Sequence, residues 1–314
     1  MKIYVAGHRG LVGGSLVRKL SQDKSNYIIK KNKSDLDLET PFEVHNFLKV
    51  ERPDIVYLAA AKVGSIRANS EMPVDFLQKN LIMQSNVFQA AFNAGVKKLM
   101  FFGSNCMYPK NAKQPIQEES LLSGLLEKTN EAYAIAKIAG VKMCEAYNFQ
   151  FSTDFRVVVP CSLYGPGDNY TDGESHVIPA LIKKFHIAKV KKDPSVTIWG
   201  TGKPLREFLY VDDLVEACDH LMRMSAKEFA TITGKGSKTI NIGSGNEVSI
   251  GNLAEIVSEV VGFKGEILND KTKPDGVARK FLDNTLITKT GWVPRVGLRE
   301  GVEFAYMDFK KSIA

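Results

Sequence analysis

Three apolar runs constrain the fold of this chain more than any other feature of its sequence. They read DIVYLAA (54–60), KKLMFFGS (97–104) and DFRVVVP (154–160). Near-continuous rather than alternating apolar residues are typical of strands buried on both faces of a parallel sheet. Helical patterns lie between the runs, at about 73–94 and 129–149. This alternation predicts an α/β fold built on a doubly wound parallel sheet.

A glycine-rich loop follows the first expected strand. The stretch VAGHRGLVGGSL places Gly7, Gly10 and Gly13 between the strand KIYVAG (2–7) and a helix over 11–22. Glycines at this spacing let the backbone approach a pyrophosphate, which rests on the helix N-terminus. The motif in this context predicts a dinucleotide-binding domain of the Rossmann type, rather than a merely tight turn.

The end of the second expected strand indicates which dinucleotide binds. NAD-selecting sites usually carry Asp or Glu there, but YIIKKNKSD (27–35) has lysines. Arg9 in the glycine loop and Lys31 or Lys33 could hold a 2′-phosphate. The sequence therefore predicts NADP(H); the alternative is that these lysines are simply solvated.

The composition of the chain changes after Pro160, where a long loop rich in Gly, Asp and Ser begins. Further helices and strands follow, including a helix over 249–262 with Ser249 as its expected N-cap. We expect residues 1–160 to form the NADP-binding Rossmann domain, with 205–243 returning to it. Residues 161–204 and 244–314 are expected to form mainly a smaller α/β substrate-binding domain.

The composition excludes several classes of protein. The 314 residues carry a formal charge of +7, but the lysines are scattered in pairs without the clustered basic element of a nucleic-acid face. No apolar stretch reaches the roughly 18 residues that span a membrane, and Met1 leads directly into a strand pattern. The four cysteines lack C-x-x-C spacing, so neither a metal site nor a disulfide framework is predicted. We expect a cytoplasmic protein without nucleic-acid or membrane partners.

A candidate catalytic group lies in NEAYAIAK, where Tyr133 and Lys137 are four residues apart and so share one helix face. A nearby ammonium is expected to lower the pKa of the phenol toward a useful range. Ser104, at the carboxyl end of an expected sheet strand, can hydrogen-bond the same substrate oxygen. Tied to the glycine loop, Tyr133, Lys137 and Ser104 together predict an acid-base site at the end of the sheet.

Seven motifs carry a resemblance to a known family: AGHRGLVGGSL, VYLAAAKVGSI, GSNCMYP, NEAYAIAKIAG, SHVIPALIKKFH, WGTGKPLREFLYVDD and KPDGVARK. The chain resembles the GDP-L-fucose synthases, extended short-chain dehydrogenases/reductases acting on GDP-4-keto-6-deoxymannose, over essentially its whole length. The resemblance implies NADP(H), a GDP-linked 4-keto-6-deoxy sugar and a homodimer, expected through the helices at 73–94 and 129–149. It also implies a set of cofactor-binding residues: Gly7, Arg9, Gly10, Leu11, Val12, Gly13, Lys31, Lys33, Asp37, Leu38, Ala59, Ala60, Ala61, Tyr133, Lys137, Pro160, Leu163 and His176.

Cys106, in FFGSNCMYP, admits two interpretations. A free cysteine is often a small buried hydrophobe. By the resemblance, however, Cys106 is the base that removes protons from C3 and C5 of the sugar, and His176 is the acid that returns them. The C4 ketone acidifies those positions, and Ser104 and Tyr133 can stabilise the resulting enolate oxygen.

Residues for the GDP-sugar are also implied by the resemblance. They are Asn105, Ser162, Lys184, Trp199, Arg206 and Asp275. Arg206 can bind a diphosphate through two parallel hydrogen bonds, and Lys184 can add a compact positive charge. Alternatively, Trp199 is a core residue at a strand end and Arg206 belongs to a surface ion pair.

Departures from the family pattern lie near the sugar. Asn105 stands where the family typically has Ser, and Cys161-Ser162 where it typically has Thr-Asn.

The expected function is C4 reduction with C3/C5 epimerisation. The first alternative is a C4 reductase alone, acting on another sugar such as a GDP-6-deoxy-4-keto-heptose; a remoter one is a sensor that binds NADP without turnover.

Overall fold

The larger sheet of this computed structural model confirms the expected fold class. The structure describes residues 1–234, 239–273 and 275–313. The strand order is β2-β1-β3-β4-β5-β9, and every neighbouring pair is parallel. The strands are β1 (Lys2–Ala6), β2 (Tyr27–Ile29), β3 (Ile55–Leu58), β4 (Lys98–Phe102), β5 (Asp154–Pro160) and β9 (Thr239–Ile242). The three apolar runs thus form the central strands β3, β4 and β5, buried as predicted.

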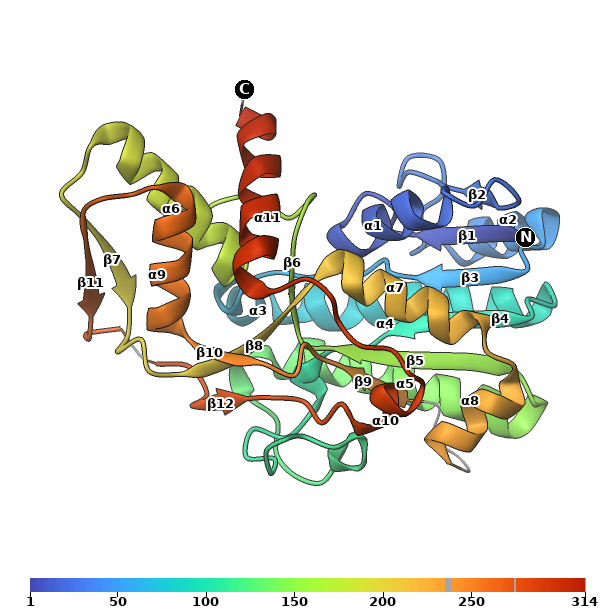
Figure 1. Cartoon of the computed structure of the whole chain (residues 1–314). Coiled ribbons are helices and arrows are strands. Elements are labelled where there is room, and N and C mark those ends of the chain that lie inside the picture. Colours follow the sequence, from blue (N-terminus) through green and yellow to red (C-terminus); the bar gives the residue numbers. More distant parts are fainter. Residues whose placement is uncertain (235–238, 274, 314) are drawn as a thin grey trace.

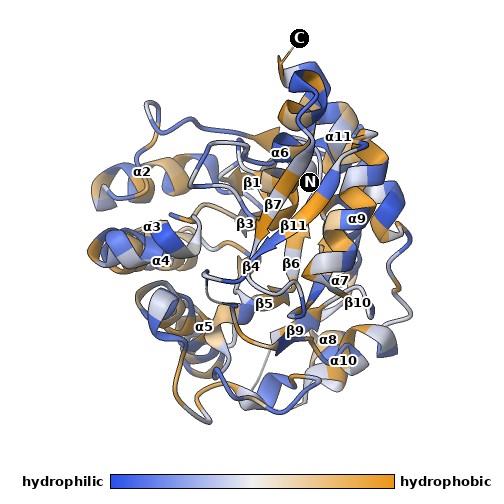
Figure 2. Cartoon of the chain, turned by 90° about the vertical axis from the view of Figure 1, so that its left-hand side faces the viewer, coloured by the Kyte–Doolittle hydropathy of each residue, from blue (hydrophilic) through white to orange (hydrophobic). Residues whose placement is uncertain are grey.

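Helices cover both faces of this sheet (Figures 1 and 2). One layer contains α2 (Pro41–Glu51), α4 (Pro73–Asn93) and α5 (Glu131–Phe151), which pack side by side in that order. On the other face α1 (Leu11–Leu20) packs against α7 (Val211–Arg223). Two shorter helices, α3 (Ile66–Glu71) and α8 (Ala226–Thr233), complete this part of the chain.

Smaller sheets lie beyond the carboxyl ends of the large sheet (Figure 1). In one of them β8 (Leu205–Tyr210) lies between β10 (Glu247–Ser249) and β12 (Arg279–Lys280), and β6 (Ser162–Tyr164) also pairs with β8. In the other, β7 (Ser195–Trp199) pairs with β11 (Glu266–Asp270). The accompanying helices are α6 (Val177–Lys191), α9 (Ile250–Val261), α10 (Thr285–Lys289) and α11 (Leu298–Ile313). The Ser249 side chain accepts a hydrogen bond from the Asn252 amide, which confirms the predicted cap of α9.

Two separate apolar cores underlie this arrangement. The first surrounds the large sheet, and the second lies among α6, α9 and α11. Strand β8 contributes to both, because Leu209 belongs to the first core whereas Phe208 belongs to the second. The segment containing Leu282 and Trp292 packs on the first core. The predicted domain boundaries remain a prediction, and this packing adds a C-terminal segment that the sequence pattern did not indicate.

Short 3-10 helices mark the connection between β4 and α5. They are η1 (Asn105–Met107), η2 (Glu118–Ser120) and η3 (Lys128–Asn130). Among the described residues, no helix is long and apolar enough to cross a membrane.

Candidate active site

The glycine loop packs closely against the neighbouring backbone. Gly7 has a φ of +83°, and a Cβ placed there would lie 2.6 Å from the Ala60 amide nitrogen. A Cβ on Gly13 would overlap the Gly7 carbonyl. The loop, the start of α1 and the segment after β3 therefore approach more closely than side chains would permit.

The N-terminus of α1 is open toward this loop. Its N-cap is Gly10, which has no side chain to satisfy the free amides of the first turn. Leu11 and Val12 begin the helix. Unsatisfied amides and the helix dipole make this end an anion site, so the chain fits the dinucleotide predicted for it.

The basic residues proposed for the 2′-phosphate differ in their surroundings. Arg9 is exposed and has no ion pair with any described residue, and the Lys31 ammonium lies 5.8 Å from the centroid of the Phe47 ring. Lys33 instead pairs with Glu39 at 2.7 Å and Asp37 at 3.6 Å. Binding a phosphate through Lys33 would require breaking these pairs, so Arg9 and Lys31 are the better placed cations.

The remaining predicted cofactor residues lie along the carboxyl edge of the sheet or next to it. Leu38 is buried in the first core, and its carbonyl accepts a hydrogen bond from the Asn86 side chain. Ala59 to Ala61 follow β3, where Ala59 donates its amide hydrogen to Ala6. Pro160 ends β5, and Leu163 pairs with Leu209 of β8.

Ser104, Cys106 and Tyr133 form a cluster just beyond the end of β4. Ser104 caps η1, accepting a hydrogen bond from the Cys106 amide, and its hydroxyl lies 3.2 Å from the Cys106 sulfur. Desolvation by burial raises the pKa of Tyr133, and a hydrogen bond with the Ser104 side chain lowers it in part. The shift is therefore opposite to the lowering that was expected from Lys137, and it keeps the Tyr133 phenol protonated.

Lys137 is buried one helical turn beyond Tyr133. Its ammonium donates a hydrogen bond to the Phe102 carbonyl at 2.8 Å and lies 5.8 Å from the centroid of the Tyr133 ring. Desolvation lowers the pKa of Lys137 to about 8, against an opposing effect of Cys106. The ammonium is thus held at the end of β4, next to the phenol that it was predicted to assist.

Cys106 differs from the other cysteines in exposure. It is partly exposed, whereas Cys144, Cys161 and Cys218 are buried. His176 is the N-cap of α6, and its side chain makes no cap hydrogen bond. Burial lowers the pKa of the His176 imidazole, which makes its protonated form a stronger acid. Among the described residues no hydrogen bond or ion pair joins His176 to Cys106, and their pairing remains a prediction.

Three of the residues predicted for the GDP-sugar line one small cavity of about 80 Å³. They are Trp199, Arg206 and Asp275. The Trp199 side chain is 68% exposed, which excludes the alternative of a core residue. The Arg206 guanidinium makes no ion pair shorter than 4.0 Å within the described ranges; its only hydrogen bond goes to the Leu205 carbonyl at 2.7 Å. An aromatic face, a cation and an acceptor therefore converge on one cavity.

The other predicted sugar residues do not line this cavity. Lys184 donates a hydrogen bond to the Thr197 carbonyl, two residues before Trp199. Asn105 lies in η1 beside Cys106, with 4.0 Å between its side-chain oxygen and the sulfur. Ser162 begins β6 and pairs with Phe208.

Sequence reasoning missed the groups that hold these residues in place. The Phe102 carbonyl, which anchors Lys137, is a backbone atom and leaves no sequence signal. Thr201 donates two hydrogen bonds to the Asp275 carboxylate, from its amide at 2.8 Å and its hydroxyl at 2.7 Å. The Ser65 hydroxyl donates to the Gly173 carbonyl at 2.5 Å and so ties α3 to the loop before His176.

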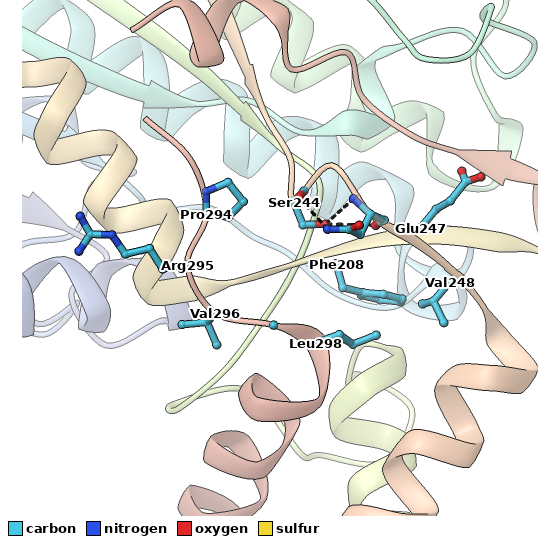
Figure 3. A pocket seen from close by; sticks show the side chains of 10 residues that line it. Phe208, Ser244, Glu247, Val248, Pro294, Arg295, Val296 and Leu298 are labelled. Carbon is cyan, nitrogen blue, oxygen red and sulfur yellow. Dashed lines mark hydrogen bonds between the residues drawn. The ribbon is translucent and has the colours of Figure 1, made fainter. Parts of the chain in front are cut away.

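A larger cavity, of about 200 Å³, lies apart from these residues. Figure 3 shows it between the strands carrying Phe208 and Val248 and the segment from Pro294 to Leu298. None of the predicted site residues lines it. No group of three or more His, Cys, Asp or Glu side chains within the described ranges could hold a metal ion.

This fold and site define a class: a Rossmann-type enzyme scaffold with the Ser, Tyr and Lys cluster of short-chain dehydrogenases/reductases. The chain belongs to the NAD dependent epimerase/dehydratase family, whose model matches residues 3–243.

Relatives within this family are similar over nearly the whole chain. GDP-L-fucose synthase 1 of Arabidopsis thaliana is 49% identical, covering 99% of this chain and 94% of its own length. GDP-L-fucose synthase of Escherichia coli strain K12 is 46% identical, with coverages of 99% and 97%. Among solved structures, the GDP-mannoheptose C4 reductase MlghC from Campylobacter jejuni, with NADP bound, gives a TM-score of 0.89 at 38% identity, covering 98% of each chain. The resemblance predicted from the sequence motifs is confirmed.

Proposed function

We propose that this protein catalyses the NADPH-dependent reduction at C4 of a GDP-linked 4-keto-6-deoxy sugar, together with epimerisation at C3 and C5. The observation that carries the proposal is the cluster of Ser104, Cys106, Tyr133 and Lys137 at the carboxyl end of β4. The relatives named GDP-L-fucose synthase, at 46 to 49% identity, support the same chemistry.

The glycine loop would hold the cofactor. Gly7, Gly10 and Gly13 would let the backbone approach the pyrophosphate at the α1 N-terminus, and Arg9 with Lys31 would hold the 2′-phosphate. When bound, NADPH supplies the hydride that reduces C4. The NADP bound to the Campylobacter jejuni relative supports this choice of cofactor.

Tyr133 and Lys137 carry the proton chemistry of the reduction. The phenol of Tyr133 donates its proton to the C4 oxygen as that oxygen gains negative charge. Lys137 places a positive charge beside the phenol and stabilises the phenolate left behind. Ser104 donates a second hydrogen bond to the same oxygen.

Epimerisation uses the two groups that reduction does not need. Cys106 removes a proton from C3 or C5, and the electrons move onto the C4 oxygen, where Ser104 and Tyr133 stabilise the enolate. His176 returns a proton to the opposite face of the same carbon. Each centre is thereby inverted without net oxidation.

The GDP moiety occupies the cavity lined by Trp199, Arg206 and Asp275. The guanidinium of Arg206 binds the diphosphate, and the exposed ring of Trp199 packs against an aromatic or sugar face. Asp275, already held by Thr201, accepts hydrogen bonds from the nucleoside.

A second candidate is C4 reduction alone on a heptose-derived substrate. The buried Cys161 and the short side chain of Ser162 stand where the family pattern has Thr-Asn, and a relative named GDP-mannoheptose C4 reductase shares the fold closely. The sensor alternative is disfavoured because Ser104, Tyr133 and Lys137 lie together.

The proposed assembly is a cytoplasmic homodimer formed through the outer surfaces of α4 and α5. Exposed apolar side chains lie along these helices: Val74, Ile135 and Phe149. A shared four-helix contact would cover them.

The test is incubation with GDP-4-keto-6-deoxymannose in deuterated water, first without and then with NADPH. Deuterium entering C3 and C5 before NADPH is added, followed by NADPH consumption, is the expected result. NADPH consumption without exchange would identify a C4 reductase alone. If neither occurs, the hexose is the wrong substrate, and the heptose analogue is tested in the same way.

A further inference from the structure

The helical turn that carries Cys106 needs contacts with the rest of the fold to keep its conformation. The 3-10 helix η1 spans only Asn105 to Met107, and its first residue is capped by the neighbouring Ser104. A single 3-10 turn contributes little stability of its own. The position of the Cys106 sulfur therefore depends on Met107, which is fully buried in the first core, and on the residues that anchor the chain immediately afterwards.

The first anchor after η1 is Tyr108. This residue is 2% exposed, and its hydroxyl donates a hydrogen bond to the side-chain oxygen of Asn241 at 2.6 Å. Asn241 lies on β9, next to β5 in the large sheet, and is fully buried. The Cys106 turn is thereby tied to the sheet rather than to the loop that follows it.

Asn241 also fixes the far end of that loop. Its side-chain amide donates to the Ile116 carbonyl at 2.9 Å, and its backbone amide donates to the Glu118 carboxylate at 2.8 Å. Tyr108 and Ile116 are thus held by opposite atoms of one side chain. Three polar groups of Asn241 have partners, and buried groups left without a partner are costly.

We infer that Tyr108 and Asn241 are positioning residues for the Cys106 base, and hence for epimerisation but not for hydride transfer. This inference rests on the proposed function. Of the groups that serve reduction, Lys137 is anchored by the Phe102 carbonyl and Tyr133 lies on α5, whereas Ser104 caps η1 itself. Loss of the Tyr108 hydroxyl should therefore move the sulfur more than it moves Tyr133 and Lys137.

The test is the variant Tyr108→Phe, with Tyr164→Phe as its matched control. Tyr164 is equally buried and its hydroxyl also donates one hydrogen bond, to the Leu298 carbonyl at 3.3 Å, but it has no link to η1. Two rates are measured for each variant: deuterium entry at C3 and C5, and NADPH oxidation with the already epimerised 4-keto sugar. Misplacing a reacting group by about 1 Å can reduce a rate by about 100-fold.

We expect Tyr108→Phe to slow deuterium entry at least about tenfold while NADPH oxidation changes by less than about threefold. The control should leave the ratio of the two rates unchanged. Equal loss of both rates in Tyr108→Phe, or a selective loss of exchange in Tyr164→Phe, would overturn the inference.

A substrate-independent measurement separates this inference from the proposed function. Because the other cysteines are buried, alkylation by iodoacetamide in the folded protein reports on Cys106. Tyr108→Phe is expected to change the rate of Cys106 alkylation severalfold, and Tyr164→Phe is not. If the unmodified protein exchanges no deuterium, the epimerase half of the proposed function fails; unchanged alkylation in Tyr108→Phe refutes the positioning role by itself.

Discussion

At the scale of single residues, Lys137 links burial directly to the pH dependence of activity. Desolvation lowers its pKa to about 8, and only the protonated form can stabilise the Tyr133 phenolate. As pH rises through that pKa the ammonium is lost, so we expect kcat/KM for reduction to fall above about pH 8. The measurement is a kcat/KM profile from pH 6 to 10, which reports groups of the free enzyme.

The control for this prediction is Lys137→Arg. A guanidinium stays charged throughout the range, so the alkaline fall assigned to Lys137 should disappear, even if activity is lower overall. A flat profile to pH 9.5 in the unsubstituted protein would contradict the assignment.

Arg206 allows a second test at the same scale. Arg206→Lys removes the planar, bidentate geometry but keeps the charge, so KM for the GDP-sugar should rise about tenfold, or about 1.4 kcal/mol, with KM for NADPH unchanged. Arg295→Lys is the matched control, because the Arg295 side chain is largely exposed and lines the separate 200 Å³ cavity. Parallel rises in both KM values would indicate a general structural effect.

At the scale of elements, two neighbouring glycines of α1 differ in whether a side chain would fit. Gly13 has no space for a Cβ, whereas Gly14 does. A Cβ on Gly13 would overlap the Gly7 carbonyl, whereas one on Gly14 would lie 3.5 Å from the His8 carbonyl oxygen, in ordinary contact. Gly13→Ala should therefore weaken NADPH binding more than tenfold by pushing α1 away from the loop. Gly14→Ala should keep binding and stabilise α1 by about 0.5–1 kcal/mol. Fluorescence titration with NADPH and thermal unfolding measure both effects; equal affinities would show that the loop tolerates the shift.

The elements also show what sequence can predict. Strands β3, β4 and β5 were predictable because burial on both faces leaves a continuous apolar run. The alignment of Tyr133 with Lys137 followed from helix periodicity. The anchors of the site were not predictable, because the Phe102 carbonyl is backbone, and Asn241 lies 133 positions from Tyr108. Burial of Tyr133 depends on the packed fold, and for that reason its effect on the pKa was misjudged from the sequence.

At the scale of the whole molecule, α4 and α5 lie side by side in one outer layer, together with α2 (Figure 2). The same α5 carries Tyr133 and Lys137 on its inner side. A contact between two copies through this layer would therefore stiffen the helix that positions the proposed catalytic pair. This arrangement makes the proposed dimer relevant to activity as well as to stability.

The prediction at this scale concerns Ile135, which lies two residues after Tyr133 and is 44% exposed. Ile135→Glu would place a charge in the proposed contact, where burying an unpaired carboxylate is costly, so the protein should become monomeric at micromolar concentration. Phe42→Glu is the control, because Phe42 is 75% exposed on α2, outside the proposed contact. Sedimentation velocity should show dimers for the unsubstituted protein and for Phe42→Glu, and monomers for Ile135→Glu. A monomeric unsubstituted protein would refute the dimer, and a dimeric Ile135→Glu would place the contact on another surface.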